Sequence, residues 1–95
     1  MRSAKILLKM NEKVKQQLPS WFDGIIEESG DEVRNPYSNE TALLDAAELS
    51  MYNLIKSAEI VLHMGLATDD CIDLINQGKD WMLAKNPQAY MTLLD

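Results

Sequence analysis

The chain has 95 residues, 46% of them hydrophobic, and a formal net charge of −6. This length suffices for a single domain over residues 1–95, and the apolar content excludes a wholly disordered chain. The acidic balance excludes a general nucleic-acid-binding body, because neutralising phosphates requires clustered bases. We expect the small core to gain stability from a partner, with a homodimer as one form of it.

The first fifteen residues are basic, whereas the rest of the chain is acidic. Residues 1–15 hold five bases and one acid, a net of +4, and residues 16–95 hold four bases and fourteen acids, a net of −10. Apolar residues at helical spacing predict a basic amphipathic helix within residues 1–18, ending before Pro19. We expect it to pack on the acidic body of its own chain. An anionic membrane or nucleic acid and a partner's apolar surface are the alternatives. Its expected contact residues are Lys5, Lys9 and Lys13.

Glycines and prolines punctuate residues 23–44, which we expect to form an irregular acidic segment. Its short apolar pieces, Ile25-Ile26 and Val33, allow a small β-ribbon that would turn at residues 28–31. Residues 36–39 have the composition of a turn.

Residues 46–64 form the clearest predicted helix. Asp45 and Glu48 have the spacing of a capping box, and Gly65 is the expected C-terminal stop. Apolar side chains cover most of the girth of this helix, which is typical of the central helix of a core.

Two further helices complete the predicted helical core, residues 45–95. Thr68 is expected to cap a helix over 69–85, and Asn86-Pro87 to begin a short helix over 87–94. Glycine inside a helix costs about 1 kcal/mol relative to alanine, so Gly78 predicts a close approach to another backbone. The predicted fold class is therefore mainly α: a small three- to four-helix bundle with an irregular acidic insertion and a short β-ribbon.

Four segments over residues 20–95 stand out together. They are Trp21-Phe22-Asp23, Gly30-Asp31-x-Val33-x-Asn35-Pro36-Tyr37-Ser38, Glu48-Leu49-Ser50-Met51-Tyr52 and Ala89-Tyr90-Met91-x-Leu93-Leu94-Asp95. In these segments the chain resembles small uncharacterised proteins of tailed phages of aquatic bacteria, including phages of cyanobacteria. The resemblance does not cover the basic N-terminal segment. It implies no activity and no catalytic residue, only a phage protein that acts in a bacterial cytoplasm or is packaged from it.

No phosphate loop, catalytic triad or metal cluster is present, so we expect no enzyme, no cofactor and no metal site. Glu59 and His63 lie four residues apart, but a metal needs a third ligand and the chain has one histidine. We expect His63 to favour the negative end of its helix and to pair with Glu59. Cys71 lies on an apolar helix face, where a buried structural role is expected rather than a nucleophilic one.

The same composition bears on the compartment. One cysteine excludes an intramolecular disulfide and fits a reducing environment. The apolar run Ile6-Leu7-Leu8 is too short for a signal sequence, and no stretch approaches the roughly 20 apolar residues of a membrane span. We expect a cytoplasmic protein of an infected bacterial cell, without a membrane span.

An acidic run and two aromatic residues form the predicted partner-binding surface. Acidic side chains around Gly30 either remain solvated or dock on a basic partner. The aromatic pair either anchors that interface or fills the open end of the core. The expected contact residues are Trp21, Phe22, Asp23, Glu27, Glu28, Asp31 and Glu32. We expect a non-enzymatic phage accessory protein that binds and modulates a host protein. The alternative is a virion component that oligomerises or caps another phage protein.

Overall fold

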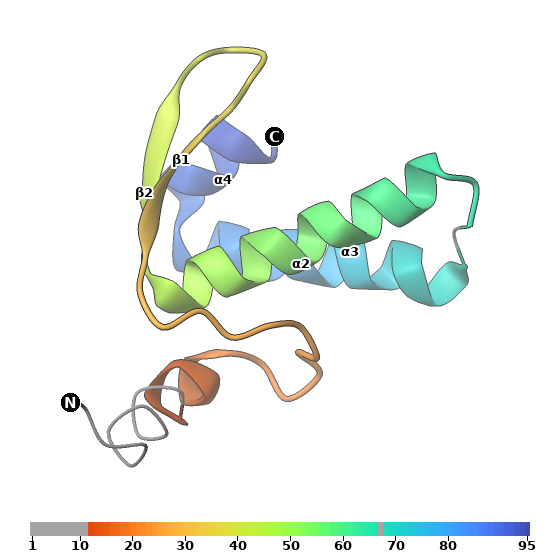
Figure 1. Ribbon diagram of the computed structural model, residues 1–95, viewed down its shortest axis with the longest axis horizontal. Helices are drawn as coiled ribbons and strands as arrows, with labels where there is room; N and C mark the ends of the chain where they lie inside the picture. Colours follow the sequence, from red (N-terminus) through yellow and green to blue (C-terminus); the bar gives the residue numbers. More distant parts are fainter. Residues whose placement is uncertain (1–11, 67) are drawn as a thin grey trace, which may run out of the picture.

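The computed structural model describes residues 12–66 and 68–95. It is mainly helical, with a two-stranded antiparallel sheet, which confirms the mainly α class (Figure 1). The predicted contacts Lys5 and Lys9 lie outside the described residues, and Lys13 is exposed in a helical stretch over 12–17. The remaining elements are β1 (Asp31–Arg34), β2 (Thr41–Leu44), α2 (Ala46–His63), α3 (Asp69–Lys85) and α4 (Pro87–Leu93).

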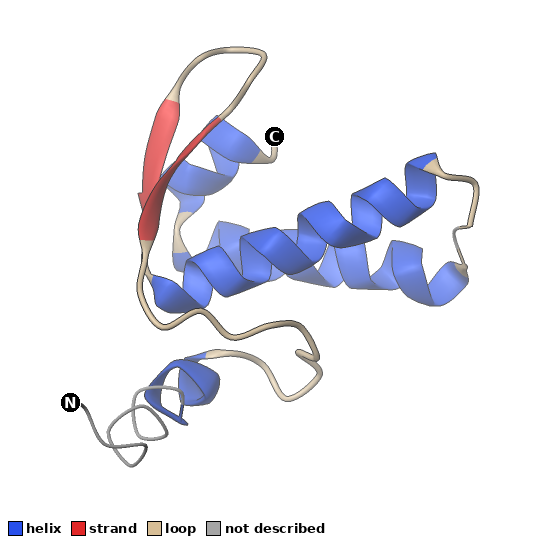
Figure 2. Cartoon of the chain, viewed as in Figure 1, coloured by secondary structure: helices blue, strands red, loops and turns tan. Residues whose placement is uncertain are grey.

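Helices α2 and α3 lie side by side as a helical hairpin, and the sheet and α4 gather at one end of it (Figure 2). We call this end the proximal end, and the α2–α3 connection the distal end. Strand β2 packs against α4 and leads directly into α2. The sheet, α4 and the start of α2 therefore meet at the proximal end (Figure 2).

The strands pair with Asp31 opposite Leu44, and the turn between them spans residues 35–40. Asn35 N donates to the Glu40 carbonyl at 2.8 Å, and Asn39 adopts a positive φ of 66°, which asparagine tolerates. The predicted turn at 36–39 is confirmed. The predicted ribbon was wrong in its turn and in one strand: the chain reverses at 35–40, and Ile25-Ile26 is not a strand.

Gly30 is the residue where the segment entering β1 crosses the start of α2. A Cβ here would overlap the Leu44 carbonyl oxygen and lie 2.8 Å from Asp45 Cα. Both neighbours are backbone, which cannot rotate away as a side chain can. Gly30 therefore permits a close chain crossing instead of forming the tip of a ribbon.

Local signals set both ends of α2. Asp45 accepts from Glu48 N at 2.8 Å, and Glu48 accepts from Asp45 N at 3.0 Å, which confirms the capping box. At the other end Gly65 has a φ of 75° and donates to the Leu62 carbonyl at 3.1 Å. Leu66 N donates to the Val61 carbonyl at 3.2 Å, completing a Schellman motif.

The caps of the last two helices also agree with prediction. Thr68 accepts from Cys71 N at 3.3 Å, and Asn86 accepts from Ala89 N at 3.1 Å. A Cβ at Gly78 would lie 2.6 Å from Ile55 Cγ1. The expected close approach therefore exists, but it is made by a side chain of α2 and not by a backbone.

The core occupies the proximal end. Its most buried large side chains, each at most 1% exposed, are Leu44, Met51, Ile55 and Met82. Val14 and Leu18 join this cluster at 7% and 8% exposure. The described part of the basic N-terminal segment thus packs its apolar side on the body of its own chain, as expected.

Candidate functional site

Exposed apolar side chains gather at the distal end of the α2–α3 hairpin. Six of them lie within the last turn of α2, the connection and the first turn of α3: Ile60, Val61, Leu62, Met64, Leu66 and Ile72. The apolar side chains of α2 therefore lie in two different environments. Its first half is buried in the core, and its last turns face outward.

A shallow groove of about 350 Å³ lies between α2 and α3 next to this end. We call it the α2–α3 groove; its lining residues are Asp23, Leu54, Ser57, Ala58, Val61, Asp70, Cys71 and Leu74. The small side chains of Ser57, Ala58 and Cys71 leave the space, and leucine and valine side chains border it. The result is an open, largely apolar surface with a carboxylate on either side.

The Ser57 hydroxyl and the Cys71 thiol, which line this groove, both donate to backbone carbonyls. The Cys71 thiol donates to the Ala58 carbonyl at 3.3 Å, and the Ser57 hydroxyl donates to the Asn53 carbonyl at 2.9 Å. Cys71 is half-buried, so its expected burial is partial. Its hydrogen bond fits the structural role that we assigned to it.

The loop that precedes β1 is hydrogen-bonded to α2 and borders the groove on a third side. Glu27 N donates to Ser50 Oγ at 2.8 Å, and that hydroxyl donates to the Ala46 carbonyl at 2.7 Å. Ser50 is only 1% exposed, and Asn53 adds a 3.3 Å bond to the Glu27 carboxylate. These bonds hold Glu27 against α2, and Asp23, earlier in the same loop, lines the groove together with Leu54.

The structure does not bring the predicted contact residues together in one place. Phe22 packs against the core, whereas Trp21 remains 36% exposed. Asp23 lines the groove, and Glu27 belongs to the loop attachment. The remaining predicted acids, Glu28, Asp31 and Glu32, are exposed at or just before β1.

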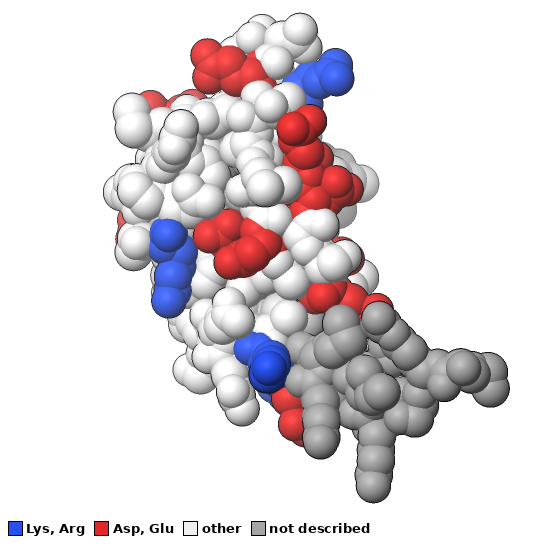
Figure 3. Space-filling view, turned by 90° about the vertical axis from the view of Figure 1, so that its left-hand side faces the viewer, with Lys and Arg blue, Asp and Glu red and all other residues white. Residues whose placement is uncertain are grey.

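Acidic side chains do not merge into one patch on the side of the molecule that carries the β-sheet. Figure 3 shows them at several separate points of this face, with basic side chains between them.

The groove residues Leu54, Val61 and Leu74 were not predicted from the sequence, because an apolar helix face normally indicates burial. The available signal was that apolar residues continue without interruption over 60–62, beyond what one face can bury.

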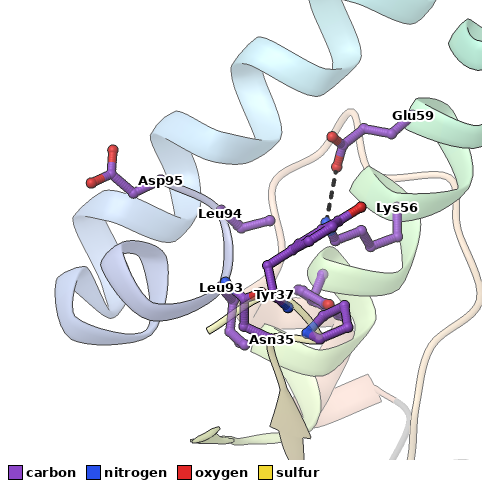
Figure 4. A pocket seen from close by; sticks show the side chains of 9 residues that line it. Asn35, Tyr37, Lys56, Glu59, Leu93, Leu94 and Asp95 are labelled. Carbon is purple, nitrogen blue, oxygen red and sulfur yellow. Dashed lines mark hydrogen bonds and ion pairs between the residues drawn. The ribbon is translucent and has the colours of Figure 1, made fainter. Parts of the chain in front are cut away.

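A second hollow, of about 440 Å³, lies between the hairpin turn, α2 and the C-terminal end (Figure 4). Lys56 Nζ lies 3.4 Å from Glu59 Oε1 and 5.7 Å from the centre of the Tyr52 ring. The partner of Glu59 is therefore Lys56; the expected pair with His63, which is exposed, is replaced.

The side-chain amide of Asn35, which lines this second hollow, makes two hydrogen bonds. Asn35 Nδ2 donates to the Thr92 carbonyl at 2.9 Å, and its Oδ1 accepts from Tyr37 N at 2.9 Å. The first bond attaches the turn of the β-hairpin to α4, and the second stabilises the turn itself. We assign the second hollow to the joint between hairpin, α2 and α4.

Two kinds of feature are absent from residues 12–66 and 68–95. In this part of the chain no three His, Cys, Asp or Glu side chains come together in a way that could hold a metal ion. The helices that the structure describes include none long and apolar enough to cross a membrane.

Comparison with known proteins adds no relative. No protein-family model matches the chain, and neither the curated proteins nor the solved structures contain a match. The phage origin that the resemblance implies stays a prediction.

Proposed function

We propose that this chain is a non-enzymatic accessory protein that binds and modulates another protein through an acidic surface centred on the α2–α3 groove. The partner is a host protein in the phage setting that the resemblance implies, encountered in the bacterial cytoplasm. In this proposal the helices form a small three- to four-helix bundle that serves as a scaffold for the contact.

The observation that carries this proposal is the groove itself. Leu54, Val61 and Leu74 border a largely apolar surface that the described residues leave uncovered. Removing apolar surface from water is favourable by roughly 25 cal/mol per Å², a gain that opposes the entropic cost of association. Exposed apolar patches with a polar border mark interaction sites.

The shape and charge of the groove favour a protein over other ligands. Small-molecule sites enclose most of their ligand, whereas this groove is shallow and open. Asp23 and Asp70 repel phosphate groups, which disfavours nucleic acid and anionic membrane surfaces.

Affinity capture from host lysate tests the proposal with two matched variants. Val61→Glu places a charge in the groove, and Ile60→Glu places the same charge one residue away, outside the groove lining. We expect wild type and Ile60→Glu to retain the same protein and Val61→Glu to lose it. Retention of that protein by all three forms, or capture of nothing above beads alone, would overturn the proposal.

The second candidate function is a virion component, favoured by the apolar side chains at the distal end that lie outside the groove. Ile60, Met64 and Leu66 are each at least 60% exposed there and suit contact with another copy. Stoichiometric amounts of the chain in purified particles, found by mass spectrometry, would support this candidate, and absence from the particles would remove it.

A further inference from the structure

We infer that the occupant of the α2–α3 groove is a basic amphipathic helix of the partner, seated with its apolar stripe between Leu54, Val61 and Leu74. The inference rests on the proposed function and names the class of partner. It follows from the dimensions, the polar atoms and the charges of the groove.

The dimensions fit a short helix. Leu54 and Val61 lie seven residues apart on α2, which is about two helical turns or roughly 10 Å at 1.5 Å per residue. A partner helix lying along this length presents side chains at i, i+3 or i+4, and i+7, the spacing by which helices bind in grooves.

The available polar atoms disfavour an extended peptide. Strand addition requires free backbone N–H and C=O groups at a sheet edge. The lining residues of α2, and Leu74 of α3, have backbone groups that bond within their helix or its cap. In the first turn of α3, Cys71 N donates to the Thr68 hydroxyl at 3.3 Å. The hydroxyl of Ser57 and the thiol of Cys71 are already donating to carbonyls of α2. The charged groups that the lining offers a partner are the carboxylates of Asp23 and Asp70.

The charges require a basic partner. Asp23 approaches from the loop and Asp70 from the first turn of α3, and both are exposed. Asp69 and Asp73 add charge on the exposed side of the same helix. Of the described residues, no lysine or arginine lines the groove. Lysine or arginine flanking an apolar stripe therefore complements this surface, and acids there would be repelled.

Three synthetic peptides test the inference on the full chain. The first, of 18 residues, carries leucine at i, i+3, i+4 and i+7 with lysine elsewhere. The second has the same composition in scrambled order, and the third has glutamate in place of lysine. Each is titrated at low salt into ¹⁵N-labelled protein and followed by amide chemical shifts. We expect the first peptide to bind about tenfold or more tightly than the others, with shifts concentrated at the groove residues.

Two sets of variants separate the contribution of the apolar contact to binding from the contribution of the charges. Val61→Glu should abolish binding of the striped peptide, whereas Ile60→Glu should not. The double change Asp23→Asn with Asp70→Asn should weaken binding about tenfold, because it removes two exposed ion pairs that each add modestly to the affinity. The matched double change Glu32→Gln with Asp80→Asn, at exposed positions outside the groove, should have little effect.

Several results would overturn the inference. Equal affinity for the scrambled peptide, or shifts away from the groove, would show that no helix is recognised there. If the chain self-associates in light scattering and Val61→Glu abolishes this, a second copy is the occupant. If lysate capture depends on Val61 while the striped peptide does not bind, the proposed function stands and the inference fails. If neither occurs, both fail.

Discussion

The proximal and distal ends of the α2–α3 hairpin both carry apolar side chains, but the two ends are stabilised in different ways. At the proximal end hydrogen bonds cross between elements: Glu48 accepts from Asn86 at 3.2 Å, and Asn35 donates to the Thr92 carbonyl. At the distal end the turn is stabilised within itself by the Schellman bonds, and its apolar side chains are exposed.

This difference teaches that stability and recognition occupy separate parts of the molecule. The proximal end buries almost all of the core, so its contacts determine the free energy of unfolding. The distal end contributes less burial, and changes there should alter binding more than folding. Four predictions test this division.

The largest expected effect comes from the core. Ile55→Ala removes a side chain with 0% exposure and should lower the free energy of unfolding by about 2–5 kcal/mol, measured by urea unfolding. The Ile55 side chain also crowds the place of a Cβ at Gly78. Gly78→Ala should therefore destabilise wild type but stabilise the Ile55→Ala variant, by up to about 1 kcal/mol. Equal effects in both backgrounds would contradict this coupling.

The second-largest loss of stability is expected where the loop before β1 is attached to α2 beside the groove. Ser50→Ala removes the acceptor of Glu27 N and should cost about 1–3 kcal/mol, since Ser50 is buried. Amide hydrogen exchange at Glu27 should accelerate, whereas exchange at Gly65, in the distal turn, should not change beyond the general loss of stability. Unaltered exchange at Glu27 would show that other contacts hold the loop.

A comparison of two helix caps sharpens the division further. Asp45→Ala should cost about 1 kcal/mol or somewhat more, because Glu48, the other half of its capping box, also accepts from Asn86. Thr68→Ala breaks a longer bond of 3.3 Å at the distal end and should cost less. Thermal unfolding of both variants checks the order, and an equal or reversed order would show that the distal cap carries as much stability.

The smallest effect on stability is expected in the groove. Val61 is 37% exposed, and Val61→Glu should change the free energy of unfolding by no more than about 0.5 kcal/mol. Ile60→Glu should behave alike in this measurement. A loss of several kcal/mol for Val61→Glu alone would mean that the groove belongs to the core.

The helices could be predicted from the sequence because their ends depend on neighbouring residues. Asp45 with Glu48, Gly65, Thr68 and Asn86 each act within a few positions, and all took their predicted roles. Nearest-neighbour chemistry was sufficient for these boundaries.

The pairing of the β-hairpin and the α2–α3 groove could not be predicted from neighbouring residues. The hairpin turn is attached through Asn35 to Thr92, 57 residues away, and Gly30 acts by crossing Leu44. The groove depends on which part of α2 meets α3 closely, and an apolar pattern alone does not separate a buried turn from an exposed one.

The position of Cys71 has a practical consequence. It is the one thiol of the chain and it lines the groove, half-buried. A maleimide reagent added to the unmodified protein therefore labels this site alone. The labelling rate becomes a direct reporter of occupancy, slowing in proportion as a bound molecule covers the sulfur, with no tag or substitution needed.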